Sequence, residues 1–509
     1  MHAHAVRSVL TLACSVGLTL AAGGASSQQL YRLTDLGTIG GRFSTAEAIN
    51  SAGQVCGASS IPDSSIDVHA FFWNGHTIED VGTLGTTAVC FDLNRAGQVT
   101  GTSFLAGNAS NHAFMWDGAT LKDLGTLGGA NSRAVAINSS GLVAGSAEVA
   151  GGREHAFLWD GSTMLDLGTL GGLESEARGI NASGQVTGFA FNALGGVHAF
   201  VSNGVAMQDL GTLGGFSSSG EAINATGQVT GRADISGGGW HAYLWNGMTM
   251  KDLGTLGGTI SEGSAINASG QVTGSSTNVG GRERAFLWDG SLMRNLGGLG
   301  GRFSRGTAIN DFGVVIGAAE LPVGDPQQPE FRPFVSIAGA LMKNLNEVID
   351  PSDPLKSRVE LLEASDVNNR GQISATGRDI RAFAQHAFLV TPLQYKIVFA
   401  APALGSGWKQ GTTVPIKMAL VGVNGERISD SRAASLIEPF CNVKFSANGA
   451  QPRTPVCMKY DATRNLFYFN WTLGTSSTGA VALTVAATYK FSMPETITTK
   501  RSKIVTITQ

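Results

Sequence analysis

The sequence predicts an all-β protein, with a β-propeller of eight four-stranded blades followed by a β-sandwich. Three observations predict this fold. A unit of about 43 residues recurs between residues 31 and 390, each unit has the pattern of four short strands, and the repeat ends near residue 394. We therefore expect three regions: a signal peptide at 1–27, the propeller at 28–393 and the sandwich at 394–509.

Three short motifs mark the repeated unit. Asp-Leu-Gly, or a close variant, begins at Asp35, Asp80, Asp123, Asp166, Asp209, Asp252, Asn295 and Asn344. Ala-Ile-Asn, or a variant, ends at Asn50, Asn94, Asn138, Asn181, Asn224, Asn267, Asn310 and Asn368. His-Ala-Phe, or a variant, begins at His69, His112, His155, His198, His241, Arg284, Arg332 and His386. Successive Asn markers lie 43 or 44 residues apart, and the last step is 58. Periods of this length indicate stacked supersecondary units.

One copy of the unit shows how four strands arise. Small residues alternate with larger ones over 263–266, and Asn267-Ala-Ser-Gly270 provides the residues of a tight turn. Asp289-Gly290 predicts a two-residue hairpin in which both residues have positive φ. Strands are expected at residues 263–266, 271–273, 285–288 and 292–296. Four antiparallel strands per period are typical of a propeller blade, whereas a solenoid would have a shorter repeat and atypical end caps.

The two ends of the repeat array are offset by one strand. Residues 31–37 have the pattern of a lone fourth strand, and the last unit stops after a third strand at 386–390. The first strand can therefore complete the last blade and close the ring without a free inner edge. A seven-bladed ring is the alternative if the divergent unit around residues 366–368 folds differently.

The motifs over residues 31–390 resemble the extracellular repeat family named HAF after the His-Ala-Phe triplet. The resemblance rests on that triplet, followed by a Trp, together with Asp-Leu-Gly-Thr-Leu-Gly-Gly and Ala-Ile-Asn in fixed order. It weakens at Arg332-Pro-Phe334 and Leu345-Asn346. It implies a secreted repeat protein, and it implies no reaction or ligand.

The composition changes after residue 394. Short apolar segments at 414–418, 467–471, 481–488 and 504–508 are separated by turn residues, which predicts a β-sandwich. Residues 411–417, with 459–463 and 468–471, resemble immunoglobulin-like modules of secreted bacterial proteins that carry a Pro-x-Lys-Phe motif. Met418 stands where that motif has Phe.

The N-terminus has the pattern of an export signal. Arg7 precedes an apolar run over 9–22, and small residues follow at 23–27. We expect a secreted or periplasmic protein without a membrane span. Cleavage would leave an even number of cysteines, which favours the disulfides Cys56–Cys90 and Cys441–Cys457 over buried thiols.

The sequence offers little support for chemistry at a fixed centre. The net charge is -3 and charged residues make up 14% of the chain, which argues against nucleic acid as a partner. The motif histidines recur at one position per unit, so a ring would hold them too far apart to share a metal. We expect these histidines and the Asp-Leu-Gly aspartates to stabilise blades by hydrogen bonds, and the repeated Trp residues to pack between blades. We predict no catalytic residue, no metal and no cofactor.

Loop residues that break the repeat are the better binding candidates. The Thr-Leu-Gly-Gly crossings and the variable loops before His-Ala-Phe should share one face of the ring. On that face we select Arg42, Phe43, Glu174, Phe216, Trp240, Arg302 and Phe303. The leading hypothesis is a non-catalytic binding or scaffold protein for an extracellular glycan or protein. The alternative is an extracellular hydrolase of glycans or lactones at the channel mouth. The sequence does not indicate an oligomeric state.

Overall fold

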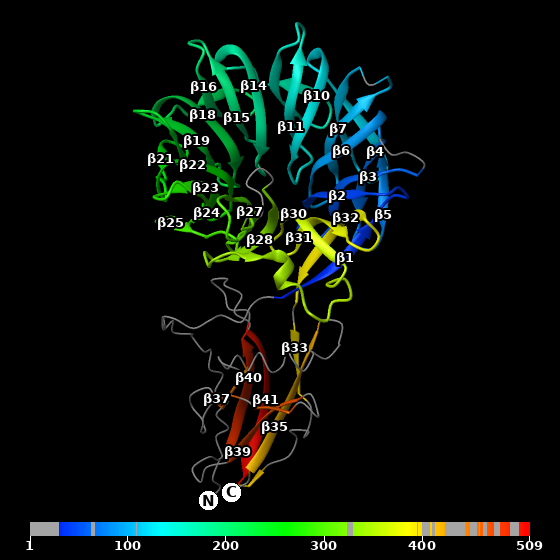
Figure 1. Cartoon of the computed structure of the whole chain (residues 1–509), viewed down its shortest axis with the longest axis vertical. Helices are drawn as coiled ribbons and strands as arrows, with labels where there is room; N and C mark the ends of the chain where they lie inside the picture. The colour runs from blue at the N-terminus through cyan, green and yellow to red at the C-terminus, as the bar shows by residue number, and fades with distance from the viewer. Residues whose placement is uncertain are drawn as a thin grey trace, which may run out of the picture.

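The computed structural model describes residues 30–62, 67–107, 109–322 and 329–393 in full, and the backbone of strands between Tyr395 and Thr508. Figure 1 shows the first part as a ring of small sheets. Each sheet contributes an innermost strand: β2 (Ser44–Ile49), β6 (Gly85–Leu93), β10 (Gly128–Ile137), β14 (Gly171–Ile180), β18 (Gly214–Ile223), β22 (Gly257–Ile266), β26 (Ser304–Ile309) and β30 (Val359–Val367). The second strands are β3 (Val55–Ser60), β7 (Val99–Leu105), β11 (Val143–Val149), β15 (Val186–Asn192), β19 (Val229–Ile235), β23 (Val272–Asn278), β27 (Val314–Glu320) and β31 (Ile373–Asp379).

The third and fourth strands complete each sheet. The third strands, which carry the His-Ala-Phe motif, are β4 (Val68–Trp73), β8 (Asn111–Trp116), β12 (Glu154–Trp159), β16 (Val197–Ser202), β20 (Trp240–Trp245), β24 (Glu283–Trp288), β28 (Phe331–Ile337) and β32 (Ala384–Pro392). The fourth strands are β5 (Ile78–Gly82), β9 (Leu121–Gly125), β13 (Met164–Asp166), β17 (Met207–Asp209), β21 (Met250–Asp252), β25 (Met293–Asn295), β29 (Lys343–Asn344) and β1 (Tyr31–Gly37). A short 3-10 helix, η1 (Leu345–Val348), follows β29. The sheets form eight four-stranded blades, so the eight-bladed propeller is confirmed and the seven-bladed alternative is wrong. We number the blades from blade 1 (β2–β5) to blade 8 (β30, β31, β32 and β1).

A closed ring of asparagines joins the blades at one mouth of the channel. In each blade the motif Asn donates its Nδ2–H to the backbone carbonyl of the corresponding Asn in the next blade, at 2.9–3.1 Å. The circuit runs from Asn50 through Asn94, Asn138, Asn181, Asn224, Asn267, Asn310 and Asn368 and returns to Asn50. Each Oδ1 also accepts N–H groups of its own turn, as Asn224 does from Thr226 and Gln228. These buried amides are thus paired, and Asn at this position serves both the turn and the ring.

The ring closes where the first strand of the chain joins the last blade. β1 pairs antiparallel with β32, from Tyr31 opposite Pro392 to Gly37 opposite Ala387. Tyr31 is 1% exposed, and the Leu33 N–H donates to Asp353 Oδ2 at 2.8 Å. Two segments more than 350 residues apart in sequence therefore share one sheet, as the offset of the repeat predicted.

One ion pair in this closure should make its stability depend on pH. His386 Nδ1 lies 2.9 Å from Asp35 Oδ1, and this hydrogen bond raises the pKa of His386. Burial alone would raise the pKa of Asp35, but the contacts with His386 and the Gly37 N–H outweigh it and lower that pKa. The His386 contribution is complete below its ordinary pKa of 6.5 and is lost as the pH rises through the raised value. The Asp35 contribution is present above 3.8 and is lost as the pH falls through the lowered value.

We therefore expect the difference in melting temperature between wild type and His386→Gln to be largest between pH 3.8 and 6.5. Thermal melts of the two proteins across a pH series would measure it. A difference that stays constant up to alkaline pH would contradict this role for the pair.

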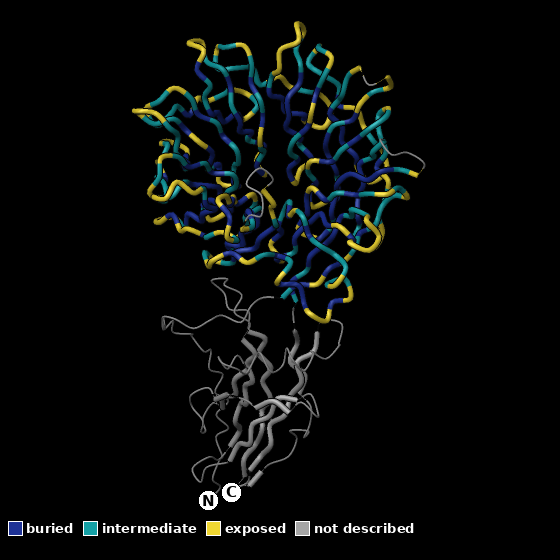
Figure 2. Tube along the Cα trace, viewed as in Figure 1, coloured by how far each residue is buried: buried dark blue, intermediate teal, exposed yellow. Residues whose placement is uncertain are grey.

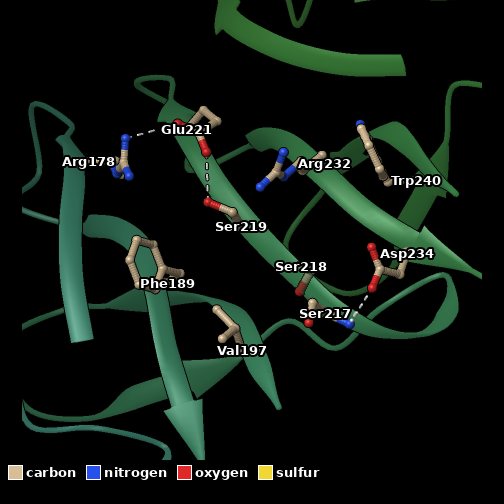
Figure 3. Close-up of a pocket in the computed structure, with 10 residues that line it drawn as sticks. All are labelled: Arg178, Phe189, Val197, Ser217, Ser218, Ser219, Glu221, Arg232, Asp234 and Trp240. Carbon is tan, nitrogen blue, oxygen red and sulfur yellow. Dashed lines mark hydrogen bonds and ion pairs between the residues drawn. The ribbon is translucent and has the colours of Figure 1, made fainter. Parts of the chain in front are cut away.

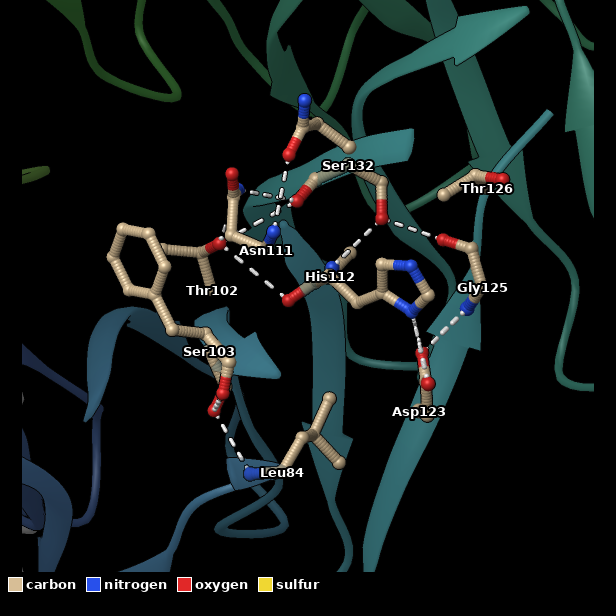
Figure 4. Close-up of polar contacts among 12 residues, drawn as sticks. Leu84, Thr102, Ser103, Asn111, His112, Asp123, Gly125, Thr126 and Ser132 are labelled. Carbon is tan, nitrogen blue, oxygen red and sulfur yellow. Dashed lines mark hydrogen bonds and ion pairs between the residues drawn. The ribbon is translucent and has the colours of Figure 1, made fainter. Parts of the chain in front are cut away.

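The other motif histidines make the same contact within their own blades. His112 Nδ1 lies 2.9 Å from both carboxylate oxygens of Asp123, whose Oδ1 also accepts the Gly125 N–H at 2.8 Å (Figure 4). Ser132 of the next blade donates to the Gly125 carbonyl and accepts the Ala113 N–H. The prediction that His and Asp stabilise the blades is confirmed. In blade 6 both residues change together, to Arg284 and Asn295, and Arg284 donates to backbone carbonyls instead.

The Asp-Gly hairpin prediction was wrong in detail. Trp288 pairs with Met293, so four residues rather than two connect β24 to β25. Gly290 has positive φ, whereas Asp289 does not. The Asp289 carboxylate accepts the N–H groups of Ser291 and Leu292, and this side-chain capping favours the longer turn.

The core lies between neighbouring blades, as the dark interior of the ring in Figure 2 shows. Phe72 of blade 1 contacts Trp116 of blade 2 with ring centroids 5.2 Å apart, which confirms that this motif Trp packs between blades. Cys56 of β3 is bonded to Cys90 of β6, so the predicted disulfide joins blades 1 and 2. Among the residues that the structure describes, no helix is long and apolar enough to cross a membrane.

The strands after residue 394 form two further sheets. One has the order β33 (Tyr395–Phe399), β35 (Thr413–Gly422), β39 (Leu466–Thr472) and β38 (Lys459–Asp461). The other has the order β34 (Trp408–Lys409), β41 (Thr498–Thr508), β40 (Gly479–Thr488), β36 (Val443–Ala447) and β37 (Val456–Cys457). The predicted signal peptide and Cys441 lie outside the described residues, so the Cys441–Cys457 disulfide stays a prediction, as does the immunoglobulin-like assignment.

Candidate functional site

In each blade, the innermost strand carries one extra, bulged residue, and the identity of this residue varies among the blades. Three residues before the motif Asn, the register with the second strand shifts by one, and the extra residue is unpaired. A β-bulge of this kind redirects a side chain away from the ladder. The eight bulged residues are Glu47, Phe91, Val135, Arg178, Glu221, Ser264, Thr307 and Ser365. The innermost strands of neighbouring blades contact one another around the axis of the ring. The bulged side chains on these strands are accessible to solvent, so they line the central channel.

A pocket opens beside the channel where blades 4 and 5 meet. It has a volume of about 600 Å³, within the range of roughly 300–1,000 Å³ that is usual for small-molecule sites. Blade 4 contributes Arg178, Phe189 and Val197. Blade 5 contributes Ser217, Ser218, Ser219, Glu221, Arg232, Asp234 and Trp240. Figure 3 shows β18 crossing the middle of this blade 4–5 pocket, with Phe189 and Val197 on one side and Arg232 and Trp240 on the other.

The pocket exists where blades 4 and 5 depart from the repeat. The residue of the second strand that lies eight positions after the motif Asn is small in the other blades: Ala58, Thr102, Ser146, Ser275, Ala318 and Thr376. Blades 4 and 5 have Phe189 and Arg232 there instead. The residue before the His-Ala-Tyr motif of blade 5 is Trp240, where blades 3 and 6 have Glu154 and Glu283. The fold does not require these large side chains. Residues of this kind are typical of a functional site added to a common fold.

The guanidinium of Arg178 is already neutralised on the blade 4 side of the pocket. Arg178 Nε lies 3.1 Å from Glu176 Oε1, and Nη1 lies 3.7 Å from Glu221 Oε2. Its guanidinium carbon lies 5.5 Å from the ring centroid of Phe189, within cation–π range. Glu221 also accepts the Ser219 hydroxyl at 2.7 Å. These contacts fix the side chains of Arg178, Glu221 and Ser219 as a polar wall beside the aromatic ring of Phe189.

On the blade 5 side, a second arginine covers a second ring. The Arg232 guanidinium carbon lies 5.5 Å from the ring centroid of Trp240. Asp234 Oδ2 accepts the Ser217 N–H at 3.0 Å, which fixes that carboxylate at the rim. Aromatic surface with hydrogen-bonding groups beside it can hold a ligand that is apolar on one face and polar at its edge.

Carboxylates gather on the innermost strands of blades 8, 1 and 2. This part of the ring lies across the channel from the pocket, because blades 8 and 1 stand opposite blades 4 and 5 in a ring of eight. Burial and the neighbouring Glu363 raise the pKa of Glu47 to about 7, although channel solvent reaches the side chain. Burial, together with Asp366, raises the pKa of Asp92 to about 7. Asp92 accepts the Ile137 N–H and Asp366 accepts the Ile49 N–H, so both brace the next blade rather than face a ligand.

The predicted binding residues lie on several blades and do not form one site. Trp240 lines the blade 4–5 pocket, and Phe216, 64% exposed, lies one residue before Ser217 of its lining. Glu174 is 3.8 Å from Arg153 in an ion pair between blades 4 and 3. The N–H groups of Arg42 and Phe43 donate to Ser60 in blade 1, and those of Arg302 and Phe303 donate to Glu320 in blade 7. The binding role of all seven residues stays a prediction.

Sequence reasoning missed Arg178, Phe189, Glu221 and Arg232. It searched segments predicted as loops, and that prediction was wrong for Glu174, Phe216 and Trp240, which lie on β14, β18 and β20. The four missed residues also lie on strands, at positions that face the channel or the blade junction. Aligning the eight copies position by position would have revealed Phe189 and Arg232, since the residue eight positions after the motif Asn is small in the other six blades.

Within the described part of the chain, no group of three or more His, Cys, Asp or Glu side chains could hold a metal ion. The pocket lining has no histidine to activate Ser217 or Ser219.

No protein-family model matches the chain, and no curated protein matches it. Among solved structures, it is similar to the β-propeller domain of the Trilobed protease from Pyrococcus furiosus, with 11% identity over 62% of this chain and 100% of that chain, and a TM-score of 0.40. It is similar to a puromycin-hydrolyzing peptidase of Mycobacterium tuberculosis, with 12% identity over 69% of this chain and 61% of that chain, and a TM-score of 0.39. The SapL1 lectin in complex with alpha methyl fucoside matches at 12% identity over 61% of this chain and 98% of that chain, with a TM-score of 0.28. At these values the similarities carry no argument about function.

Proposed function

We propose that the protein is a secreted, non-catalytic binding protein that holds an extracellular glycan in the blade 4–5 pocket. The observation that carries this proposal is the pair of aromatic rings, Phe189 and Trp240, set among charged and hydroxyl side chains. Blades 3 and 6 have a Ser and a Glu at these two positions. A sugar ring has an apolar face that packs on aromatic surface and a rim of hydroxyls that bond to carboxylates and guanidinium groups.

Secretion is part of the same proposal. The export-like N-terminus and the Cys56–Cys90 disulfide support it, because disulfides persist in oxidising compartments. The HAF resemblance is consistent with it. We propose that the C-terminal sheets form an immunoglobulin-like module, which serves as a spacer or a second adhesive surface.

A glycan screen with Trp240→Ala tests the pocket. Wild type should bind at least one oligosaccharide class, and Trp240→Ala should weaken that binding at least about tenfold, since truncating a central aromatic anchor costs about 2 kcal/mol or more. Phe331→Ala is the matched control, because Phe331 is a 40% exposed aromatic at the position of Trp240 in blade 7. Equal loss in both variants, or no glycan binding by wild type, would refute this function.

The competing function is an extracellular hydrolase of glycans or lactones in the channel. The observation that favours it is Glu47, whose pKa of about 7 would suit a general acid, near Glu363. An enzyme should release product from a bound substrate, and Glu47→Gln should abolish that release while leaving substrate binding in place. Binding without turnover would leave the binding function alone.

A further inference from the structure

We infer that the glycan held in the blade 4–5 pocket is acidic, with a uronic-acid unit whose carboxylate pairs with Arg232 while its ring lies against Trp240. This inference rests on the proposed function and adds the chemical class of the ligand.

The charge balance around the channel singles out Arg232. Arg133 lies 3.0 Å from Glu176, Arg178 lies 3.1 Å from the same carboxylate, and Arg305 lies 3.0 Å from Glu262. Arg232 also approaches Glu262, but only to 4.0 Å, and that carboxylate already bonds to Arg305. Among the channel-side arginines of the described ring, Arg232 is therefore the one whose charge is least compensated.

The surroundings of Arg232 favour an anionic ligand group over an internal partner. Its side chain is 50% exposed. Asp234, two residues along β19, accepts the Ser217 N–H at 3.0 Å through Oδ2, and its carboxylate makes no ion pair with Arg232 in the described ring. A planar guanidinium binds a carboxylate through two parallel hydrogen bonds, so an incoming carboxylate can displace the long contact with Glu262.

The aromatic ring of Trp240 beside Arg232 indicates why the carboxylate of the ligand should belong to a sugar. The guanidinium lies 5.5 Å from the Trp240 ring centroid, so a group that pairs with Arg232 sits next to aromatic surface. In a uronic acid the carboxylate is attached directly to the pyranose ring. Ser217, Ser219 and Glu221 border the same pocket and can bond to the remaining hydroxyls. The C-terminal carboxylate of a peptide could make the same ion pair, but it would bring fewer hydroxyls to this polar lining.

The test compares oligogalacturonate with its methyl ester, which keeps the sugar rings and removes the charge. Oligomers of glucuronate and mannuronate are compared with their esters in the same way. By isothermal titration, wild type should bind the acid of at least one uronate at least about tenfold more tightly than its ester in low salt, and this preference should shrink as salt is raised. Arg232→Gln should bring the acid-to-ester ratio close to one.

Arg153→Gln is the matched control, because Arg153 is 49% exposed and lies outside the pocket lining. It should leave the ratio unchanged. Equal binding of acid and ester by wild type would overturn the acidic ligand while the glycan-binding function stands. Absence of binding to any of these oligosaccharides and to neutral glycans would overturn both, as would binding only to peptides with a free C-terminal carboxylate.

Discussion

Starting the chain after Gly37, which removes β1, should lower the melting temperature of the propeller sharply or leave it unable to fold. The deletion exposes the outer edge of β32 and removes Tyr31, Leu33 and Leu36, which are 1%, 9% and 5% exposed. Each buried side chain of this size contributes about 1.5–3 kcal/mol. The sum, roughly 5–9 kcal/mol, approaches the whole stability of a typical domain, about 5–15 kcal/mol.

A chain that begins at Leu30 is the control, because it keeps the whole of β1. Calorimetry of the two truncated proteins beside the full chain would separate the loss of the strand from the loss of the preceding residues. If both truncated proteins melted at the temperature of the full chain, the closure of the ring by β1 would contribute nothing to stability.

Removing the Cys56–Cys90 disulfide should be the second large effect, lowering the free energy of unfolding by about 3–4 kcal/mol. The bond closes a segment whose ends are 34 residues apart, so its loss releases conformational entropy in the unfolded chain. The double variant Cys56→Thr, Cys90→Ala is suited to this test. It restores the pair that blades 2 and 3 have at the same positions, Thr100 and Ala134, where Thr100 donates to the Phe114 carbonyl at 2.7 Å.

Denaturant unfolding of this variant and of wild type, each with and without reductant, would isolate the covalent contribution. The free energy of unfolding of wild type should fall when the disulfide is reduced, whereas that of the variant should be the same with and without reductant. Equal stability of oxidised wild type and the variant would show that the covalent bond adds nothing to the packing.

The repeat made the architecture predictable, because the structural role of each marker motif can be inferred from its local sequence. Asn267 ends a strand and starts a turn, and the equal spacing of its counterparts implies a ring in which they meet. The offset of residues 31–37 from the last repeat was sufficient to predict the pairing of β1 with β32. Spacing alone did not reveal the hydrogen bond from each Asn to the next, because that contact depends on how closely neighbouring blades approach.

The blade 4–5 pocket was less predictable for a physical reason. Trp240 stood out because it precedes a motif, but Phe189 and Arg232 lie within strands, where a large residue usually means core. A β-bulge cannot be recognised from one copy of the repeat, so the direction of Arg178 and Glu221 toward the channel was also hidden. The charge balance that distinguishes Arg232 depends on distances between blades that only the folded ring supplies.

The most direct test of the binding function restores the repeat at the pocket and measures what is lost. The triple variant Phe189→Ser, Arg232→Ser, Trp240→Glu places in blades 4 and 5 the residues that blades 3 and 6 have at these positions: Ser146, Ser275, Glu154 and Glu283. Oligosaccharide binding and thermal melting would be measured on this variant and on wild type. The proposed function predicts a melting temperature close to that of wild type and loss of glycan binding. Retention of wild-type affinity by the folded variant would place the ligand site elsewhere on the ring.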